Sequence, residues 1–200
     1  MIAFTRYIFA AGLVLLLPGT FSPRSTFKLP GEPPTLFAFH PAPDWVYFMF
    51  PEARIPYGRL IKTAARAHGV DPHLVAAVVA AESGFDAAAV SYKGAVGLMQ
   101  VIPASVEEWD RLLEPGQNLK TGVAHLKSLL EFFDGDLIKS LAAYNCGLGR
   151  LQRTGAIPAK GETPLFLRNV LEYYAWFWSG APGPGFPPDA AQEHQAGVPR

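Results

Sequence analysis

The most reactive candidate in the sequence is a glutamate at the end of a long apolar run. Glu82 is the first ionisable residue after eight consecutive apolar residues (74–81), and Gly84 follows shortly after it. Burial disfavours the ionised carboxylate, and the negative end of a helix dipole disfavours it by a further ~0.3–1 kcal/mol. A carboxyl group that stays protonated near neutral pH can act as a general acid. The alternative is a glutamate that has simply emerged into solvent where its helix ends.

Histidine and cysteine offer no second reactive centre in the sequence. The five histidines show no close metal-ligand spacing, and Cys146, the single cysteine, can form neither an internal disulfide nor a cysteine-rich metal site. We therefore predict no metal and no organic cofactor. The net charge is zero and the lysines and arginines are scattered, so a nucleic acid is not an expected partner. We expect a monomer.

The elements that must position Glu82 are predicted to be helices. Residues 57–68 show helical spacing and end at Gly69, and Asp71 and Pro72 are typical of the cap and first residue of a helix. The helix that they begin is apolar all round, so it belongs in the core. Further helices are predicted from Pro103 toward Trp109, over 118–133, from Asp136 to Asn145, and from Thr163 and Pro164 to Trp178. With no convincing strand, the sequence predicts an all-α domain over residues 57–178.

The N-terminus differs from this domain. Arg6 precedes an apolar run (7–17) that Pro18 ends, a pattern typical of a secretory signal and too short for a membrane-spanning helix. We predict that residues 1–22 are a signal peptide or an uncleaved anchor. The protein would then be exported to the periplasm or cell envelope, and a retained segment would make the inner membrane a partner. The alternative is a buried core helix.

Proline-rich segments flank the predicted domain on both sides. Residues 23–56 are predicted to form an extended linker, because proline fixes φ and removes a backbone donor. Residues 179–200 are predicted to be a disordered tail. The linker contains an aromatic patch, which we expect to dock onto the domain rather than to bind a ligand: Trp45, Tyr47, Phe48 and Phe50.

Short motifs follow one another along the predicted domain. They are Glu82-Ser83, Gly97-Leu98-Met99-Gln100, Gln117-Asn118-Leu119, Ala143-Tyr144-Asn145-Cys146-Gly147 and Glu162-Thr163. Their order and intervals resemble those of the soluble lytic transglycosylase family, within the lysozyme-like superfamily. The resemblance implies a lysozyme-like helical domain with a substrate groove, and an enzyme that cleaves peptidoglycan glycan strands.

The resemblance also implies roles for the first two motifs. Glu82 would be the catalytic acid and base, and Ser83 would position either Glu82 or the sugar. The segment 97–100 would line the groove, with Met99 and Gln100 touching the glycan.

The later motifs would complete the groove. Tyr144 and Asn145 would lie across the groove near the reacting sugar, with the Tyr144 hydroxyl forming a hydrogen bond near the catalytic glutamate. Glu162 would support the groove wall from behind. Phe166 stands where the family usually has tyrosine, which puts rate or substrate preference in doubt, and Cys146 replaces a usual alanine.

Some of these residues have alternatives that involve no substrate. Gly97 could serve only a tight turn, and Met99 could be core filling. We expect Asn118 to anchor a helix start or a loop rather than to bind sugar, and His125 to pack on its helix rather than to react.

The sequence offers poor candidates for a second carboxylate, although most glycosidases use two. Asp86 falls in a predicted loop, and Glu107 and Glu108 fall on a predicted exposed helix face. The expected reaction therefore uses Glu82 alone, first as acid and then as base, and ends in a 1,6-anhydromuramyl product. A lysozyme-type hydrolase and a catalytically silent glycan-binding scaffold are the alternatives.

Overall fold

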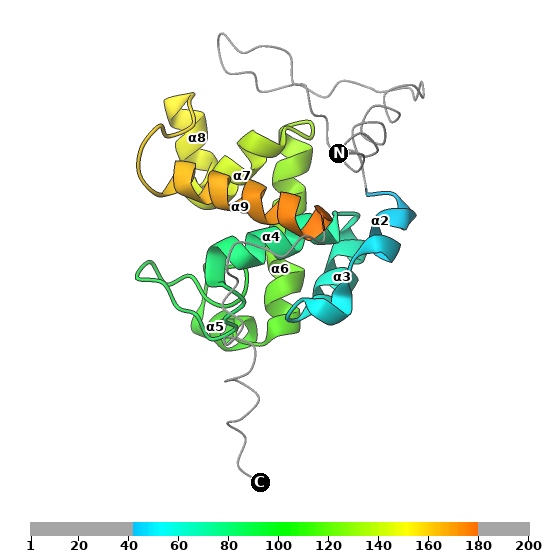
Figure 1. The fold of residues 1–200 in the computed structure, drawn as a ribbon. Helices are drawn as coiled ribbons and strands as arrows, with labels where there is room; N and C mark the ends of the chain where they lie inside the picture. Colours follow the sequence, from blue (N-terminus) through cyan, green and yellow to red (C-terminus); the bar gives the residue numbers. More distant parts are fainter. Residues whose placement is uncertain (1–41, 180–200) are drawn as a thin grey trace, which may run out of the picture.

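A computed structural model describes residues 42–179, and this part of the chain is helical (Figure 1). Its only strand-like features are isolated β-bridges, Val90–Val96 and Val96–Val101. The all-α prediction is therefore confirmed. The helices are α2 (Asp44–Met49), the 3₁₀ helix η2 (Glu52–Arg54), α3 (Gly58–His68), α4 (Pro72–Ser83), α5 (Val106–Leu112), α6 (Pro115–Phe132), α7 (Leu137–Cys146), α8 (Leu148–Thr154) and α9 (Glu162–Ser179).

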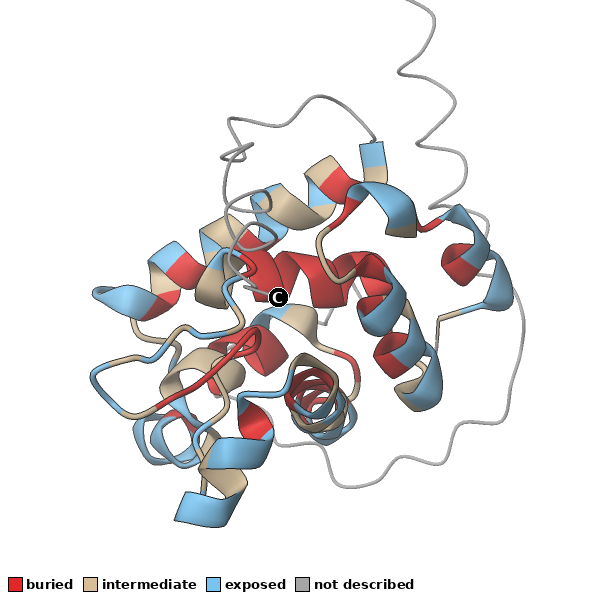
Figure 2. Cartoon of the chain, turned by 90° about the horizontal axis from the view of Figure 1, so that it is seen from below, coloured by how far each residue is buried: buried red, intermediate tan, exposed pale blue. Residues whose placement is uncertain are grey.

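Helix α4 is the buried axis of the domain, as its sequence predicts. The Asp71 side chain accepts the His73 backbone N–H at its start, and Gly84 ends it in the left-handed region (φ +60°). Every residue from 72 to 80 is buried, and Figure 2 shows these residues in red across the middle of the molecule. Helix α9 packs along α4, and α3 also contacts it.

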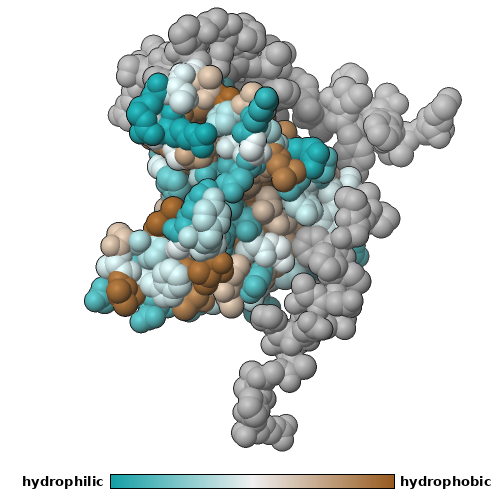
Figure 3. Space-filling model, turned by 90° about the vertical axis from the view of Figure 1, so that its left-hand side faces the viewer, coloured by the Kyte–Doolittle hydropathy of each residue, from teal (hydrophilic) through white to brown (hydrophobic). Residues whose placement is uncertain are grey.

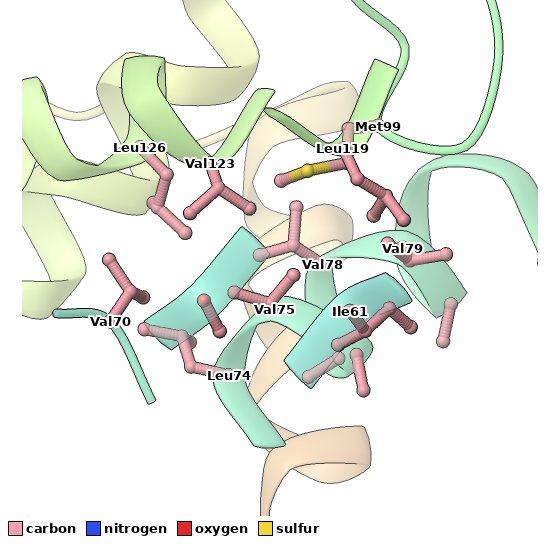
Figure 4. Packing of buried hydrophobic residues seen from close by; sticks show 14 of the residues in the cluster. Ile61, Val70, Leu74, Val75, Val78, Val79, Met99, Leu119, Val123 and Leu126 are labelled. Carbon is pink, nitrogen blue, oxygen red and sulfur yellow. The ribbon is translucent and has the colours of Figure 1, made fainter. Parts of the chain in front are cut away.

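Aliphatic side chains from several helices meet around α4 (Figure 4). Val75 and Val78 of α4 face Val123 of α6, and Ile61 of α3 lies on another side of the same cluster. Interiors of this kind are close-packed, so they hold the two ends of α4 in fixed places. The position of Glu82 is therefore set by the core.

The prediction of an extended linker is wrong for residues 44–54, which form α2 and η2. Pro43 and Pro51 lie outside α2, where proline costs no helical hydrogen bond. Tyr47 and Phe50 are buried in the main core cluster, which confirms that part of the aromatic patch docks onto the domain. Phe48 remains exposed.

Helices α5 and α6 were predicted, but each begins at a different residue from the one expected. Helix α5 begins after Ser105, whose hydroxyl accepts the Glu108 backbone N–H, rather than at Pro103. Helix α6 begins three residues before 118, because the Glu114 carboxylate caps it. In both cases a polar side chain that satisfies free backbone N–H groups sets the boundary.

Helices α8 and α9 also depart from the prediction. Helix α8, which begins directly after Gly147, was not predicted from the sequence. Helix α9 includes Glu162, one residue before the predicted Thr163 cap. The N-terminal segment 1–22, most of the predicted linker and residues 180–200 lie outside the described residues. None of the described helices has both the length and the apolar character needed to cross a bilayer.

Candidate active site

Glu82 lies in the last turn of α4, where the buried helix reaches a surface groove. Burial and, as a smaller cause, the nearby negative charge of Glu162 together raise the pKa of its carboxyl to about 8. Within residues 42–179, the Glu82 carboxyl has no hydrogen-bond or ion-pair partner. The group is therefore protonated near neutral pH and free to donate its proton.

The groove consists of two adjoining hollows. A hollow of about 350 Å³ contains Glu82, and a hollow of about 970 Å³ continues from it. Both are lined by Gln100, Tyr144 and Asn145. Figure 3 shows this face, hollowed between hydrophilic residues above and a mixed polar and apolar lobe below.

Ser83 joins the end of α4 to the segment 97–100. Its hydroxyl lies 2.9 Å from the Leu98 carbonyl oxygen and 3.2 Å from that of Val79. Ser83 lines neither hollow. In the described structure, the contacts of Ser83 therefore hold the backbone at Leu98 beside the end of α4 that carries Glu82.

Asn118 fixes the turn that carries Gln100. Its amide group donates to the Val96 and Leu112 carbonyl oxygens (2.8 and 2.9 Å), and its side-chain oxygen accepts the Met99 N–H (2.8 Å). The prediction that Asn118 is an anchor is confirmed. Gly97 has a φ of +74°, and a Cβ at this position would collide with the Asn118 amide. The turn therefore requires glycine.

The prediction that the whole segment 97–100 lines the groove is wrong. Gly97, Leu98 and Met99 are buried, and none of the three lines either hollow. Met99 packs in the core against Gly122 of α6, where a Cβ would meet its side chain. Only Gln100 faces the groove. Its amide nitrogen is 3.0 Å from the Gly97 carbonyl oxygen, so the turn holds the side chain in place.

Tyr144 closes the floor of the groove at the end of α7. Its hydroxyl donates to the Met99 carbonyl oxygen (2.8 Å), and its ring stacks 6.5 Å from that of Phe166. Burial and the nearby Glu82 carboxyl raise the pKa of Tyr144 well above its ordinary value. The hydrogen bond predicted near Glu82 is thus made to a backbone carbonyl. The phenylalanine at 166 has no hydroxyl to offer at its own position on this wall.

Asn145 and Thr163 hold the two sides of this wall together. The Thr163 hydroxyl lies 2.9 Å from the Asn145 side-chain oxygen, which joins the end of α7 to the start of α9. Asn145 lines both hollows, as predicted for a residue facing the sugar.

Glu162 lies in the groove, whereas the sequence analysis placed it behind the wall. Its carboxylate is 2.9 Å from the Lys93 ammonium and 3.4 Å from the Tyr92 hydroxyl. It lines both hollows and is exposed. Glu162 is therefore the second carboxylate that the sequence analysis did not find. The Glu162-Thr163 motif does not reveal this position, because α9 begins 80 residues after Glu82 and only the fold brings the two carboxyl groups to one groove.

Other groove residues were missed or misplaced. His125, which was expected only to pack on its helix, lines the larger hollow with its ring 5.3 Å from that of Tyr144. Glu108, predicted to be exposed, also lines that hollow, and its carboxylate accepts the Ala104 N–H (2.6 Å). The groove residues that sequence reasoning did not single out include Tyr92, Lys93, Ile102, Arg150 and Lys160.

The described residues contain no group of three or more histidine, cysteine or acidic side chains that could hold a metal ion. The groove offers carboxyl, hydroxyl and amide groups, from residues such as Glu82, Thr163 and Asn145. This arrangement, a protonated carboxyl at the end of a core helix beside an open groove, can donate a proton to a bound ligand.

Comparison with known proteins places this groove in a family. Residues 59–166 match the family model described as the transglycosylase SLT domain. The chain belongs to this family. The matched range runs from α3 to the Phe166 wall, so the SLT domain contains all the site residues named above.

Several relatives share the SLT domain. Over 145 residues the chain is 40% identical to membrane-bound lytic murein transglycosylase F from Desulfosudis oleivorans, a match that covers 61% of this chain and 31% of the relative. The 70 kDa soluble lytic transglycosylase from Escherichia coli superposes with a TM-score of 0.57 at 26% identity, covering 68% of this chain and 26% of that one. An inactive glutamate-to-glutamine mutant of lytic transglycosylase Slt from Pseudomonas aeruginosa gives a TM-score of 0.55 at 26% identity, covering 66% and 25%. The chain thus spans about a third or less of these proteins.

Proposed function

We propose that this SLT domain is a peptidoglycan lytic transglycosylase in which Glu82 acts first as acid and then as base. One observation carries the proposal: a largely buried carboxyl with a pKa of about 8 and no partner among the described residues opens into the groove. The relatives support it, because each is named a lytic transglycosylase. The inactive glutamate-to-glutamine relative supports a single essential glutamate.

The proposed reaction breaks the β-1,4 bond between N-acetylmuramic acid and N-acetylglucosamine. The Glu82 carboxyl donates its proton to the bridging oxygen, and the bond from that oxygen to C1 of the muramic acid breaks. The muramyl N-acetyl group stabilises the resulting cation, as in substrate-assisted glycosidases. The Glu82 carboxylate then removes the proton of the 6-hydroxyl, whose oxygen bonds to C1. The product is a 1,6-anhydro end, and no water is consumed.

The position of Glu162 favours one second candidate, a lysozyme-type hydrolase. Two carboxyl groups that face one groove can serve as acid and base for an attacking water. Against this assignment, Glu162 is exposed and tied to Lys93, and this contact lowers its pKa. A low pKa makes a carboxylate a weaker base. We therefore assign Glu162 an electrostatic role: its negative charge helps to keep Glu82 protonated.

The setting proposed for this activity is the cell envelope. Peptidoglycan is the proposed partner, and the names of the membrane-bound relatives agree with an envelope location. The apolar run at residues 7–17 supports export, with the segment either cleaved or kept as an anchor. We propose residues 57–178 as the catalytic domain, and the protein acts as a monomer.

Digestion of purified peptidoglycan tests the proposal, with wild type, Glu82→Gln and Glu162→Gln compared side by side. Mass spectrometry should find 1,6-anhydromuramyl products with wild type, fewer of the same products with Glu162→Gln, and none with Glu82→Gln. Products one water heavier that disappear in Glu162→Gln would establish the hydrolase instead. Undiminished activity of Glu82→Gln would exclude both mechanisms, and a wild type that binds glycan without cleaving it would indicate a silent scaffold.

A further inference from the structure

The outward face of α2 has no part in the groove or in the core. Trp45, Phe48 and Met49 are exposed to 54%, 85% and 61%, whereas Val46 and Tyr47 of the same short helix are buried. The helix is therefore apolar on both of its faces. Adjacent large apolar side chains on a protein surface commonly mark a binding site.

The charges beside this face leave an excess of positive charge. Residues 44–68 contain four basic and two acidic residues, with histidine counted as neutral. Each acidic residue is already paired: Asp44 with Arg66 at 3.5 Å, and Glu52 with Lys62 at 3.3 Å. The excess resides on the remaining two basic residues, in η2 and the first turn of α3.

Those two residues are Arg54 and Arg59, and both are exposed. Neither has an ion-pair partner within the described part of the chain. They lie in the elements that directly follow α2. Arg59 lies on the same face of α3 as Lys62 and Arg66, and Arg66 pairs with Asp44 of α2. Positive charge therefore adjoins the apolar side chains of α2, and this combination matches a negatively charged, apolar-centred ligand such as a lipid bilayer.

The α2 face and the groove lie at opposite ends of α4. Trp45 packs edge-on against Trp178 (5.8 Å between ring centres), and the Trp178 indole N–H donates to Asp71 at the start of α4 (3.2 Å). Glu82 lies at the other end of this 12-residue helix, which is about 18 Å long. In Figure 1, α2 lies on the side away from α8 and α5. A surface docked on α2 would therefore leave the groove open.

We propose that Trp45, Phe48 and Met49 form an interfacial contact with a bilayer containing anionic lipid, with Arg54 and Arg59 meeting its headgroups. Tryptophan and other large apolar side chains favour the boundary between headgroups and acyl chains. Residues 18–43 join the apolar run at 7–17 to α2. A membrane that held the run would therefore be tethered 26 residues from α2 along the chain. This contact goes beyond the proposed catalysis and does not depend on it.

Site-directed spin labelling of the full chain tests this contact. Labels are placed by Phe48→Cys and, as a matched control, by Val106→Cys, each in a Cys146→Ala background. Val106 is similarly exposed (77%) and apolar, but lies on α5 at the far side of the domain. Collisions with oxygen and with a water-soluble nickel chelate are measured without lipid, with phosphatidylcholine vesicles, and with vesicles that also contain phosphatidylglycerol.

With phosphatidylglycerol present, the label at 48 should lose most of its nickel collisions and gain oxygen collisions, while the label at 106 stays aqueous. Replacing Arg54 and Arg59 by glutamine should weaken this change several-fold. A label at 48 that stays aqueous in every vesicle would overturn the proposal and leave a protein partner as the occupant. A label at 48 already shielded without lipid would also overturn it, because another part of the chain or a second copy would then cover the face. Equal insertion into pure phosphatidylcholine would contradict the role assigned to the arginines.

Discussion

The two ends of α4 carry carboxyl groups in opposite circumstances. At the start of the helix, the buried Asp71 carboxylate accepts the His73 backbone N–H (2.8 Å), the Tyr174 hydroxyl (2.7 Å) and the Trp178 indole N–H (3.2 Å). At the other end, the largely buried Glu82 carboxyl has no partner among the described residues, and its pKa is raised to about 8. Burial alone does not make a carboxyl reactive. Burial without hydrogen-bond donors does, because only then is the neutral acid favoured.

The largest expected effect is on activity, at the Glu82 end. Glu82→Gln keeps the shape of the side chain but has no proton to donate, so the rate of glycan cleavage should fall by about 10²–10⁴-fold or more. Turnover of purified peptidoglycan measures this loss, with circular dichroism as the check that the helices are intact. Turnover within a few-fold of wild type would show that the Glu82 carboxyl, like that of Asp71, is structural.

The next largest effect is on stability, at the Asp71 end. Asp71→Ala removes the cap of α4 and leaves buried donors unpaired, so the free energy of unfolding should fall by about 3–5 kcal/mol. Urea denaturation measures the loss. Asp71→Asn is the matched control, since it keeps one acceptor oxygen and should lose less. Cleavage by the folded fraction of Asp71→Ala should remain near that of wild type, and a selective loss of activity would contradict the assignment.

Part of this comparison could be read from the sequence and part could not. The run 74–81, with Asp71 before it and Gly84 after it, predicts both the helix and the burial of Glu82, because caps and apolar periodicity are local signals. The partners of Asp71 come from Tyr174 and Trp178, about 100 residues away, and only tertiary packing brings them to it.

The groove residues also divide into those that the sequence predicts correctly and those that it does not. Glu82, Gln100, Tyr144 and Asn145 were predicted, and all four line it. Met99 was misplaced, since the turn held by the distant Asn118 rotates its side chain into the core. Local motifs identify which segments form a site, but the direction of each side chain depends on contacts that adjacent residues do not reveal.

The unfolding free energy should depend on pH through the carboxyl group at the Glu82 end of α4. Glu82 has a folded-state pKa of about 8, above its ordinary 4.5, so the fold favours the neutral acid. The stability contributed in this way is fully present below pH 4.5 and is lost as the pH rises from 4.5 through 8; the loss is on the order of 5 kcal/mol. Glu82→Gln should abolish this loss, so its unfolding free energy should exceed that of wild type at pH 9.

Activity should follow the same titration. Cleavage by wild type should decline above about pH 8, because the general acid is then ionised. Urea denaturation and turnover, each measured from pH 5 to pH 9, give the two curves. Two curves for wild type that bend at well-separated pH values would show that a group other than Glu82 controls one of them.

The smallest expected effect concerns the support of the Glu82 end. Ser83→Ala removes the hydroxyl that contacts the Leu98 carbonyl oxygen (2.9 Å), which should cost about 0.5–1.5 kcal/mol of stability. Activity should fall more than this cost alone implies, because the contact holds the turn that presents Gln100 to the groove beside Glu82. Tyr174→Phe removes one comparable hydrogen bond at the Asp71 end, so its stability loss should be similar while its turnover is unchanged. Equal turnover of the two variants, measured at a pH where both are fully folded, would show that Ser83 supports the fold without positioning the site.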